Sequence, residues 1–325
     1  MKAGFQSYQT RKHPLRLNPV FRKMILLAPP GARMPGLLNQ EKVYCDRECY
    51  EDYLGEAQAL RGAIYLEDGA INSSELVGGR HVGESDRASW HLLVVDGAGR
   101  ICGCVRYRHY DSPSKLAFSE LMASHSSLAS CARWGNKMRA AVEDELLLSQ
   151  ALNLPFVEIG GWALDAEIRG TVEALRMVLA AYAFSREFGG AVGLATATVR
   201  HSSASILRRI GGQPLEHNGE EVPSYTDSHY NCEMELLRFH SWALNPRYDI
   251  WIDKIAQEIR DITVVSGTAP ETATRWRCWP NNQRADSKRE PDVRVLRKSA
   301  EHTHQRALRV PDGMAEKARS RRALR

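Results

Sequence analysis

The stretch that decides the fold is Phe156-Val157-Glu158-Ile159-Gly160-Gly161-Trp162-Ala163-Leu164. Its aliphatic and aromatic residues predict a buried strand over 156–164. A glycine pair weakens a strand, and its usual reason is a β-bulge or a ligand whose backbone lies close against the sheet. The stretch therefore predicts a strand that bulges at Gly160-Gly161, with a ligand site beside it.

The same strand carries a single carboxylate, Glu158, among apolar neighbours. Burial would raise the pKa of such a group, which suits a general base. The alternative is that Glu158 pairs with an arginine on a neighbouring strand, such as Arg106. The sequence leaves both interpretations open.

The strand leads into Asp165-Ala166-Glu167-Ile168-Arg169-Gly170-Thr171, and a long helix is expected over 168–188, stopped by Gly189-Gly190. Unpaired N–H groups at a helix start bind phosphate. Arg169 would add positive charge there, and Gly170 would allow a close approach. The turn is therefore a candidate phosphate site.

The surrounding pattern places this stretch within a larger sheet. Three- and four-residue spacing predicts a helix over 50–64, and apolar runs predict a hairpin of strands 90–95 and 101–107. One or two helices are expected over 115–152. Further on we expect a strand over 191–199, a short helix over 203–210 and a strand over 233–239. A hairpin followed by alternating strands and helices predicts an α/β fold with a mixed sheet.

Charge divides the 325 residues into three parts. The net charge of +5 arises from basic ends, because residues 1–40 carry seven Lys/Arg and no acid, and residues 265–325 carry a net +8. The middle, 41–264, carries a net −10. We therefore expect a basic flexible arm over 1–40, an acidic folded domain over 41–264, and a basic disordered tail over 265–325.

Seven cysteines without a secretory signal indicate a reducing, cytoplasmic location. No run approaches the length of a membrane helix. Cys45 and Cys49 are spaced as on one helical turn, but no second Cys/His pair has a matching spacing. No metal site is expected.

The order of hairpin, glycine-split strand, Arg-Gly turn and long helix resembles the GCN5-related N-acetyltransferase (GNAT) superfamily. The resemblance implies a mixed, mostly antiparallel central sheet flanked by helices, with a splayed, bulged strand, and acetyl-CoA or another acyl-CoA as co-substrate. The family's Gln/Arg-x-x-Gly-x-Gly/Ala pattern is matched by its first and last residues only, since Val172 stands where Gly is expected. The residues expected to hold the donor by this resemblance are Gly160, Gly161, Trp162, Ala163 and Leu164 along the pantetheine, and Arg169, Gly170, Thr171, Val172, Glu173 and Ala174 around the pyrophosphate.

The chain more closely resembles the acyl-homoserine-lactone and N-acyl amino acid synthases, over about residues 45–240. Three motifs carry the likeness: the strand 158–164, Gly103-Cys104-Val105-Arg106, and Leu207-Arg208-Arg209-Ile210-Gly211. In the first, Gly160-Gly161 replaces Ser-Arg, so synthesis of a quorum signal is not the first expectation. The resemblance implies that Arg61, Asp86 and Arg106 bind the acceptor.

These observations predict an N-acyltransferase that moves an acyl group, acetyl first, from acyl-CoA to a small-molecule amine. Glu158 is the first candidate for the general base and His201 the second. One alternative is a synthase that takes its acyl group from acyl carrier protein. Another alternative is a non-catalytic module whose basic tails bind nucleic acid. Nucleic acid is the least favoured partner, because the tails lack regularly spaced aromatic residues.

Overall fold

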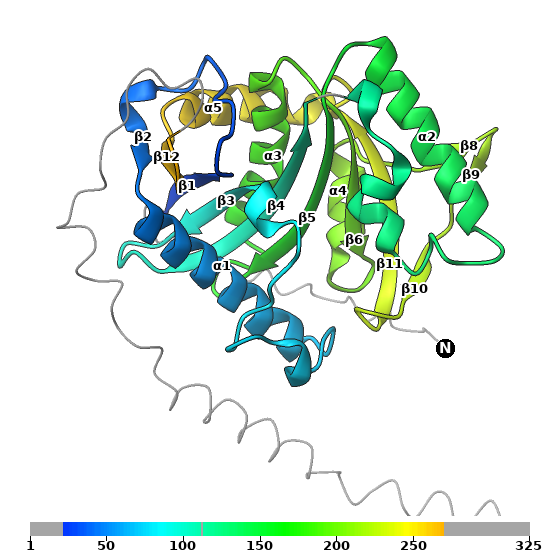
Figure 1. Ribbon diagram of the computed structural model, residues 1–325, viewed down its shortest axis with the longest axis horizontal. Coiled ribbons are helices and arrows are strands. Elements are labelled where there is room, and N and C mark those ends of the chain that lie inside the picture. Colours follow the sequence, from blue (N-terminus) through cyan, green and yellow to red (C-terminus); the bar gives the residue numbers. More distant parts are fainter. Residues whose placement is uncertain (1–21, 112, 270–325) are drawn as a thin grey trace, which may run out of the picture. The chain divides into compact units, whose positions relative to one another are not determined.

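A computed structural model describes residues 22–111 and 113–269, and within these ranges ten strands form one sheet (Figure 1). The strands of its main path are, in sheet order, β10 (Tyr225–Asp227), β11 (Cys232–His240), β6 (Val192–Thr198), β5 (Phe156–Leu164), β4 (Ile101–Tyr110), β3 (Trp90–Val95), β1 (Lys23–Ala28), β12 (Thr263–Ser266) and β2 (Val43–Cys45). The short β7 (Gln213–Pro214) also pairs with β11, and β8 (Glu216–His217) and β9 (Glu220–Glu221) form a separate hairpin.

Most neighbouring strands are antiparallel. Parallel pairing joins β5 to β6, and β12 to both β1 and β2. The sheet is therefore mixed and mostly antiparallel, as the sequence predicted. The parallel pair β5/β6 requires a crossover connection, and the helix between these two strands supplies it.

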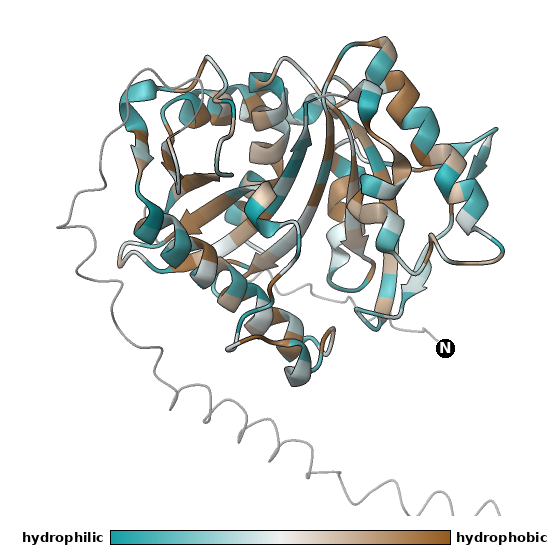
Figure 2. Ribbon diagram, in the orientation of Figure 1, coloured by the Kyte–Doolittle hydropathy of each residue, from teal (hydrophilic) through white to brown (hydrophobic). Residues whose placement is uncertain are grey.

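Five α-helices flank the sheet: α1 (Arg47–Glu67), α2 (Gly135–Ala151), α3 (Val172–Glu187), α4 (Ser203–Ile210) and α5 (Asp249–Arg260). The apolar faces of α1 and α2 pack on one side, over separate parts of the sheet. The opposite side is covered by α3, and α5 packs on α3. Figure 2 shows the central strands mainly in hydrophobic colours, with alternating colours along α1 and α2. This alternation is expected of helices with one buried face.

The long helix α3 is apolar on most of its surface because it lies between the sheet and α5. Its side chains are buried from Met177 to Ser185 without interruption. The helix begins four residues later than predicted. Gly170, at φ +69°, interrupts the helical path, and the side chain of Thr171 caps the first turn by accepting a hydrogen bond from the N–H of Glu173 (3.2 Å).

The predicted domain boundaries need correction. Within the supposed arm, Lys23–Ala28 forms β1, which lies between β3 and β12 with Leu27 fully buried. Burying such a leucine stabilises the fold by roughly 1.5–3 kcal/mol. The domain also extends past residue 264, because Val265 and Ser266 are buried in β12. An interior strand is a continuous apolar run without alternation, which is why β1 was missed. Residues 1–21 and 270–325 lie outside the described ranges.

Most other elements follow the predictions closely. The strands 90–95 and 156–164 and the helix 203–210 have the predicted bounds. The region 115–152 contains short 3-10 turns followed by α2 alone. In the described ranges, no helix is both long and apolar enough to cross a membrane.

Candidate acyl-transfer site

The strand β5 carries the bulge that the glycine pair predicted. Cys104 pairs with Ala163 and Arg106 with Gly160, so Val105 of β4 faces two residues of β5, Gly161 and Trp162. Gly161 has φ +64°, a conformation that glycine adopts without steric cost. The bulge therefore depends on a glycine at this position.

The strands β5 and β6 separate beside the bulge. Their parallel pairing ends at Ile159 and Ala195, although β5 continues to Leu164 and β6 to Thr198. Main-chain groups on this edge of β5 consequently have no strand partner beyond Ile159. The predicted splay of the bulged strand is confirmed.

A cleft of about 990 Å³ opens at this splay. Its walls come from β5, from the turn before α3, from the end of β6, and from the loops around residues 81–88 and 120–126. The residues predicted for the site that line the cleft are Arg106, Gly160, Gly161, Trp162, Ala163, Leu164, Arg169, Gly170, Ala174 and His201. The others, which do not line it, are Arg61, Asp86, Glu158, Thr171, Val172 and Glu173.

Behind the cleft wall lies a buried ionic cluster of Arg61, Asp86 and Arg106, which we call the arginine–aspartate cluster. Arg61 Nη2 donates to Asp86 Oδ2 at 2.5 Å, and Arg106 Nη1 donates to Asp86 Oδ1 at 3.1 Å. The side chains of Arg61 and Asp86 are 2% and 1% exposed. Burial opposes the charge of Asp86, but the two guanidinium groups outweigh it and hold the pKa of this carboxyl well below its usual range. The three residues therefore lie together, but only Arg106 lines the cleft, and binding of the acceptor by the three stays a prediction.

The glycine pair leaves space for the arginines. A Cβ at Gly161 would lie 3.2 Å from Arg61 Nη1, and one at Gly160 would lie 3.9 Å from Arg106 Nη2. Arg61 also donates to the carbonyl of His81 at 2.7 Å, so it links the loop carrying His81 to the bulge. The arginine–aspartate cluster therefore packs directly against the bulge of β5.

Replacing Gly161 by alanine tests whether this packing requires a glycine. The positive φ and the contact with Arg61 predict a loss of about 1–3 kcal/mol in the free energy of unfolding. Gly97→Ala is the matched control, because a Cβ there meets nothing within 4 Å. Urea denaturation of both variants measures the difference. Equal stabilities would contradict the steric requirement at Gly161.

Glu158 is 3% exposed. One interpretation of the sequence paired it with Arg106, but Arg106 instead forms its ion pair with Asp86. The Glu158 carboxylate accepts hydrogen bonds from the N–H groups of Met122 (2.7 Å) and Ala123 (2.8 Å) and from the hydroxyl of Tyr110 (2.8 Å). Burial raises the pKa of Glu158, although these three bonds oppose the rise. Tyr110 itself lines the cleft, so it connects the buried carboxylate to that space.

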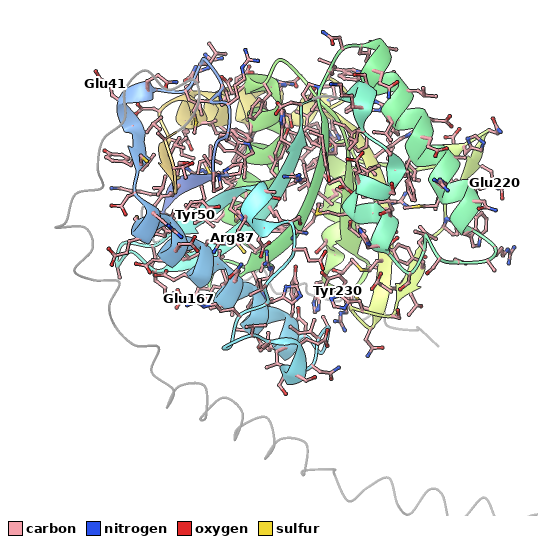
Figure 3. The ribbon with its side chains drawn as sticks, in the orientation of Figure 1. Glu41, Tyr50, Arg87, Glu167, Glu220 and Tyr230 are labelled. Atoms are coloured by element: carbon pink, nitrogen blue, oxygen red, sulfur yellow. The ribbon has the colours of Figure 1, made fainter. Side chains whose placement is uncertain are left out.

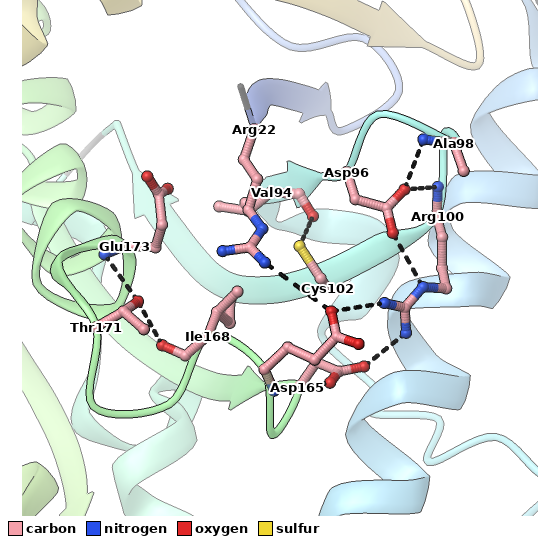
Figure 4. Close-up of polar contacts among 11 residues, drawn as sticks. Arg22, Val94, Asp96, Ala98, Arg100, Cys102, Asp165, Ile168, Thr171 and Glu173 are labelled. Carbon is pink, nitrogen blue, oxygen red and sulfur yellow. Dashed lines mark hydrogen bonds and ion pairs between the residues drawn. The ribbon is translucent and has the colours of Figure 1, made fainter. Parts of the chain in front are cut away.

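Ion pairs and a hydrogen bond made by two arginines hold the turn after β5 in place. Arg100 binds Asp165 at 2.7 Å and Asp96 at 3.1 Å, as Figure 4 shows. Arg169 Nε donates to the carbonyl of Leu164 at 2.9 Å, and its guanidinium lies 3.9 Å from Asp68. The start of α3 and the side chain of Arg169 therefore lie at the end of the bulged strand, beside the cleft.

His201 also lines the cleft, from the short turn after β6. Its backbone has φ +65°, its side chain is half exposed, and its Nε2 is 3.5 Å from Asp68 Oδ2. Asp68 thus lies within 4 Å of two predicted site residues, His201 and Arg169. The sequence analysis did not single out Asp68 as a site residue.

Four cleft residues that the sequence did not indicate form an aromatic wall: Tyr65, His81, His229 and Tyr230. The ring of Tyr65 lies 5.3 Å from that of His81 and 5.7 Å from that of Tyr230, both edge-on. Figure 3 shows Tyr230 between the end of α1 and the β10–β11 hairpin. Burial and nearby Arg61 lower the pKa of His81 to about 4, which keeps it neutral at neutral pH. They come from the end of α1, from the loop around residue 81 and from the β10–β11 turn, and no sequence pattern links these three segments.

A small apolar pocket of about 30 Å³ lies between the splayed strands, α3 and α4. It shares Ile159, Gly160, Trp162 and Thr196 with the cleft, so the two spaces meet at the splay. The rest of its lining is Val105, Val178, Ala181, Tyr182, Ala195, Leu207, Gly212, Leu237 and Phe239. A volume of this size holds about two or three non-hydrogen atoms.

These features define a class of fold. A mixed, mostly antiparallel sheet whose bulged strand splays from its parallel neighbour, beside a helix that begins after an Arg-Gly turn, is a GNAT-like fold, which confirms the resemblance in fold. Among the described residues, no group of three or more His, Cys, Asp or Glu is arranged to hold a metal ion.

No family model and no curated protein sequence matches the chain. Among solved structures it is similar to BjaI, a CoA-dependent acyl-homoserine lactone synthase, with 16% identity and a TM-score of 0.46 over 78% of this chain and 96% of that one. It is also similar to FeeM, an N-acyl amino acid synthase from uncultured soil microbes (12% identity, TM-score 0.37, 57% and 83% covered), and to the AHL synthase LasI (14%, 0.38, 59% and 84%). These likenesses concern the fold.

Proposed function

We propose that this chain is an N-acyltransferase that moves a short acyl group, acetyl being the simplest, from an acyl-CoA thioester to a small amine. The observation that carries this proposal is the splay of β5 from β6. It combines unpaired main-chain groups, a bulge, a large cleft and a small apolar pocket at one point.

The donor would lie along Gly160–Leu164, whose free main-chain edge can hydrogen-bond a pantetheine amide. Its acyl end would enter the apolar pocket, and its phosphates would lie at Arg169–Ala174, at the start of α3. Backbone N–H groups at the bulge would stabilise the oxyanion that develops on the thioester carbonyl, at roughly 3 kcal/mol for each donor. The small pocket favours a short acyl group over the long chain of a carrier-protein-dependent synthase.

The acceptor would enter along the aromatic wall. Arg106 faces the cleft, whereas Arg61 and Asp86 hold Arg106 in place from behind. An amine is protonated at neutral pH, since its pKa is near ~10, and must lose a proton before or during attack. A base within reach is therefore needed.

We assign this role to Glu158, acting through Tyr110. The nitrogen attacks the carbonyl carbon, the C–S bond breaks, and the thiolate leaves. The amine attacks in its neutral form, after its ammonium form has lost one proton to solvent. The second proton, which the nitrogen loses as the amide forms, passes to the Tyr110 hydroxyl as that hydroxyl gives its own proton to Glu158. His201 at the rim is the second candidate for the base, and no residue is assigned as the general acid.

The direct test is release of free thiol from acetyl-CoA in the presence of a panel of amines, with product masses measured. Acylated amine and CoA in equal amounts are expected. Absence of turnover, together with absence of binding of CoA thioesters and of acylated carrier protein, would reject the proposal.

Arg169→Ala separates phosphate binding from the rest of the site. Loss of one charge-assisted contact is expected to raise KM for acetyl-CoA about tenfold or more. KM for S-acetylpantetheine, which lacks the phosphates, should not change. Arg139→Ala, on the exposed face of α2, is the control. An equal effect on both donors would show that Arg169 acts only through the turn.

A further inference from the structure

One hydrogen-bond donor beside the bulge has no acceptor: the indole N–H of Trp162. Its Nε1 is shielded from water and has no hydrogen-bond partner in the part of the chain that the structure describes. An indole N–H can only donate. Buried polar groups in native proteins are nearly always hydrogen-bonded, and each exception needs an explanation. A ligand atom that accepts a hydrogen bond would supply one.

Trp162 lies where the cleft and the apolar pocket meet. Four residues line both spaces, and they are Ile159, Gly160, Trp162 and Thr196. The ring of Trp162 packs against the core on the α3 side of the sheet, which is the side of the apolar pocket. The indole is therefore positioned to meet a group that passes from the cleft into the pocket.

Thr196 carries the other side-chain donor at this junction, but its situation differs. Thr196 is exposed on β6, so its hydroxyl can bond water in the free protein, and a ligand would only replace that water. The N–H of Trp162 is shielded from water and has no such bond to lose. A ligand acceptor at the junction therefore gains most from Trp162.

The proposed position of the donor identifies the acceptor atom. The pantetheine would lie in the cleft along Gly160–Leu164, and the acyl carbons would lie in the pocket. The thioester joins these two parts, so its carbonyl would lie at the junction. We propose that Trp162 Nε1 donates a hydrogen bond to the thioester carbonyl oxygen and stabilises the oxyanion that forms on it. This inference rests on the proposed acyl transfer and adds a side-chain donor to the main-chain groups of the bulge.

The bond would act on the charge that develops during the reaction. As the amine nitrogen attacks the carbonyl carbon, the π electrons of the C=O bond move onto the oxygen, and the hydrogen bond from Trp162 strengthens. When these electrons return, the C–S bond breaks and CoA leaves as the thiolate. The indole keeps its proton throughout, so it stabilises charge without acting as an acid.

Trp162→Phe is expected to lower kcat with acetyl-CoA about 10²-fold, the usual cost of removing one oxyanion donor, with a smaller change in KM. Replacing Trp162 by 3-benzothienylalanine keeps the shape of the ring with sulfur in place of the N–H. This second variant separates loss of the donor from loss of ring volume, and its kcat should fall to the same extent. Melting temperatures show whether each variant is folded.

Binding in the absence of an amine tests the bond apart from turnover. Acetyl-CoA and S-ethyl-CoA differ in the carbonyl oxygen, and calorimetry measures the dissociation constant of each. Wild-type protein is expected to bind the thioester about five- to tenfold more tightly, the usual worth of one hydrogen bond. Both Trp162 variants should lose most of this preference.

Trp90→Phe is the matched control. Trp90 is 3% exposed, packs against Phe184 at 5.2 Å and lines neither space, so kcat and the preference should persist. Folded Trp162 variants that keep either their kcat or the preference would overturn the inference. Equal weakening of both ligands would also overturn it, because the indole would then bind the pantetheine arm that they share. If acetyl-CoA is turned over with any of these results, only this inference falls. If no CoA thioester binds, the proposed function falls with it.

Discussion

Asp86→Asn is expected to lower the free energy of unfolding by about 3–5 kcal/mol and to abolish acyl transfer. In the part of the chain that the structure describes, Asp86 is the one carboxylate that binds Arg61 and Arg106, and it also accepts hydrogen bonds from Gln58 (3.0 Å) and from the N–H of Gly83 (2.9 Å). An amide cannot neutralise two guanidinium groups, and its N–H₂ would face donors. The variant therefore leaves buried positive charge without a partner.

The size of this effect comes from burial, so the control is an exposed pair. Glu51 binds Arg87 at 2.5 Å with both side chains at least one-third exposed, and Glu51→Gln should cost at most about 1 kcal/mol. Urea denaturation compares the two. Similar losses in both variants would contradict a special role for the arginine–aspartate cluster.

The arginine–aspartate cluster also predicts that the free energy of unfolding falls at acid pH. Because the pKa of Asp86 in the folded protein is depressed below its value in the unfolded chain, the unfolded chain binds the proton first as pH falls. The stabilisation is complete above the unfolded pKa of about 4 and is lost as pH falls below it. The wild-type protein should lose more stability than Asp86→Asn between pH 5 and pH 2.

Tyr110→Phe and Glu158→Gln are each expected to reduce kcat about 10²- to 10³-fold, with a smaller change in KM for the donor. Tyr110→Phe removes the relay but leaves both main-chain hydrogen bonds to Glu158 in place. Glu158→Gln keeps the shape and removes the base. Steady-state kinetics measure both, and melting temperatures identify any loss of folded protein.

The pH profile distinguishes a base from a purely structural carboxylate. Burial raises the pKa of Glu158, so kcat/KM should fall at acid pH through a value above the usual glutamate range, and Glu158→Gln should abolish that limb. Tyr107→Phe is the control for loss of a phenol and should keep the wild-type profile. Full activity in Tyr110→Phe would exclude the relay. Retention of the acid limb in Glu158→Gln would make His201 the base.

The local features of the site were predictable because each depends on neighbouring residues. A glycine pair inside an apolar strand marked the bulge, and the periodic apolar segment after Arg169-Gly170 marked α3, although its start was predicted at 168 and lies at Val172. The association of Arg61, Asp86 and Arg106 came from resemblance alone, since 25 residues separate the first two and their contact depends on the packing of α1 against β4 and β5.

Other features followed from no local pattern. The apolar run 24–28 was too short, and too close to basic and proline-rich residues, to reveal an interior strand. Its partner β12 lies more than 230 positions away in sequence. The main-chain partners of Glu158 come from a loop 35 residues upstream, and a pairing with Arg106 was equally consistent with the sequence. The aromatic wall joins the end of α1 to the loop that carries His81 and the turn between β10 and β11, three segments far apart in the sequence.

By itself, then, the sequence determined where this strand bulges and that a long helix follows it, because glycine φ angles and apolar periodicity are set within a few residues. The first turn of that helix was placed four residues too early. Only the tertiary structure decided what the bulge faces. The apolar pocket and the three hydrogen bonds to Glu158 arise where α3, α4 and distant loops pack against β5. Burial and partner distance are properties of that packing, and they set the charge and reach of each group in the site.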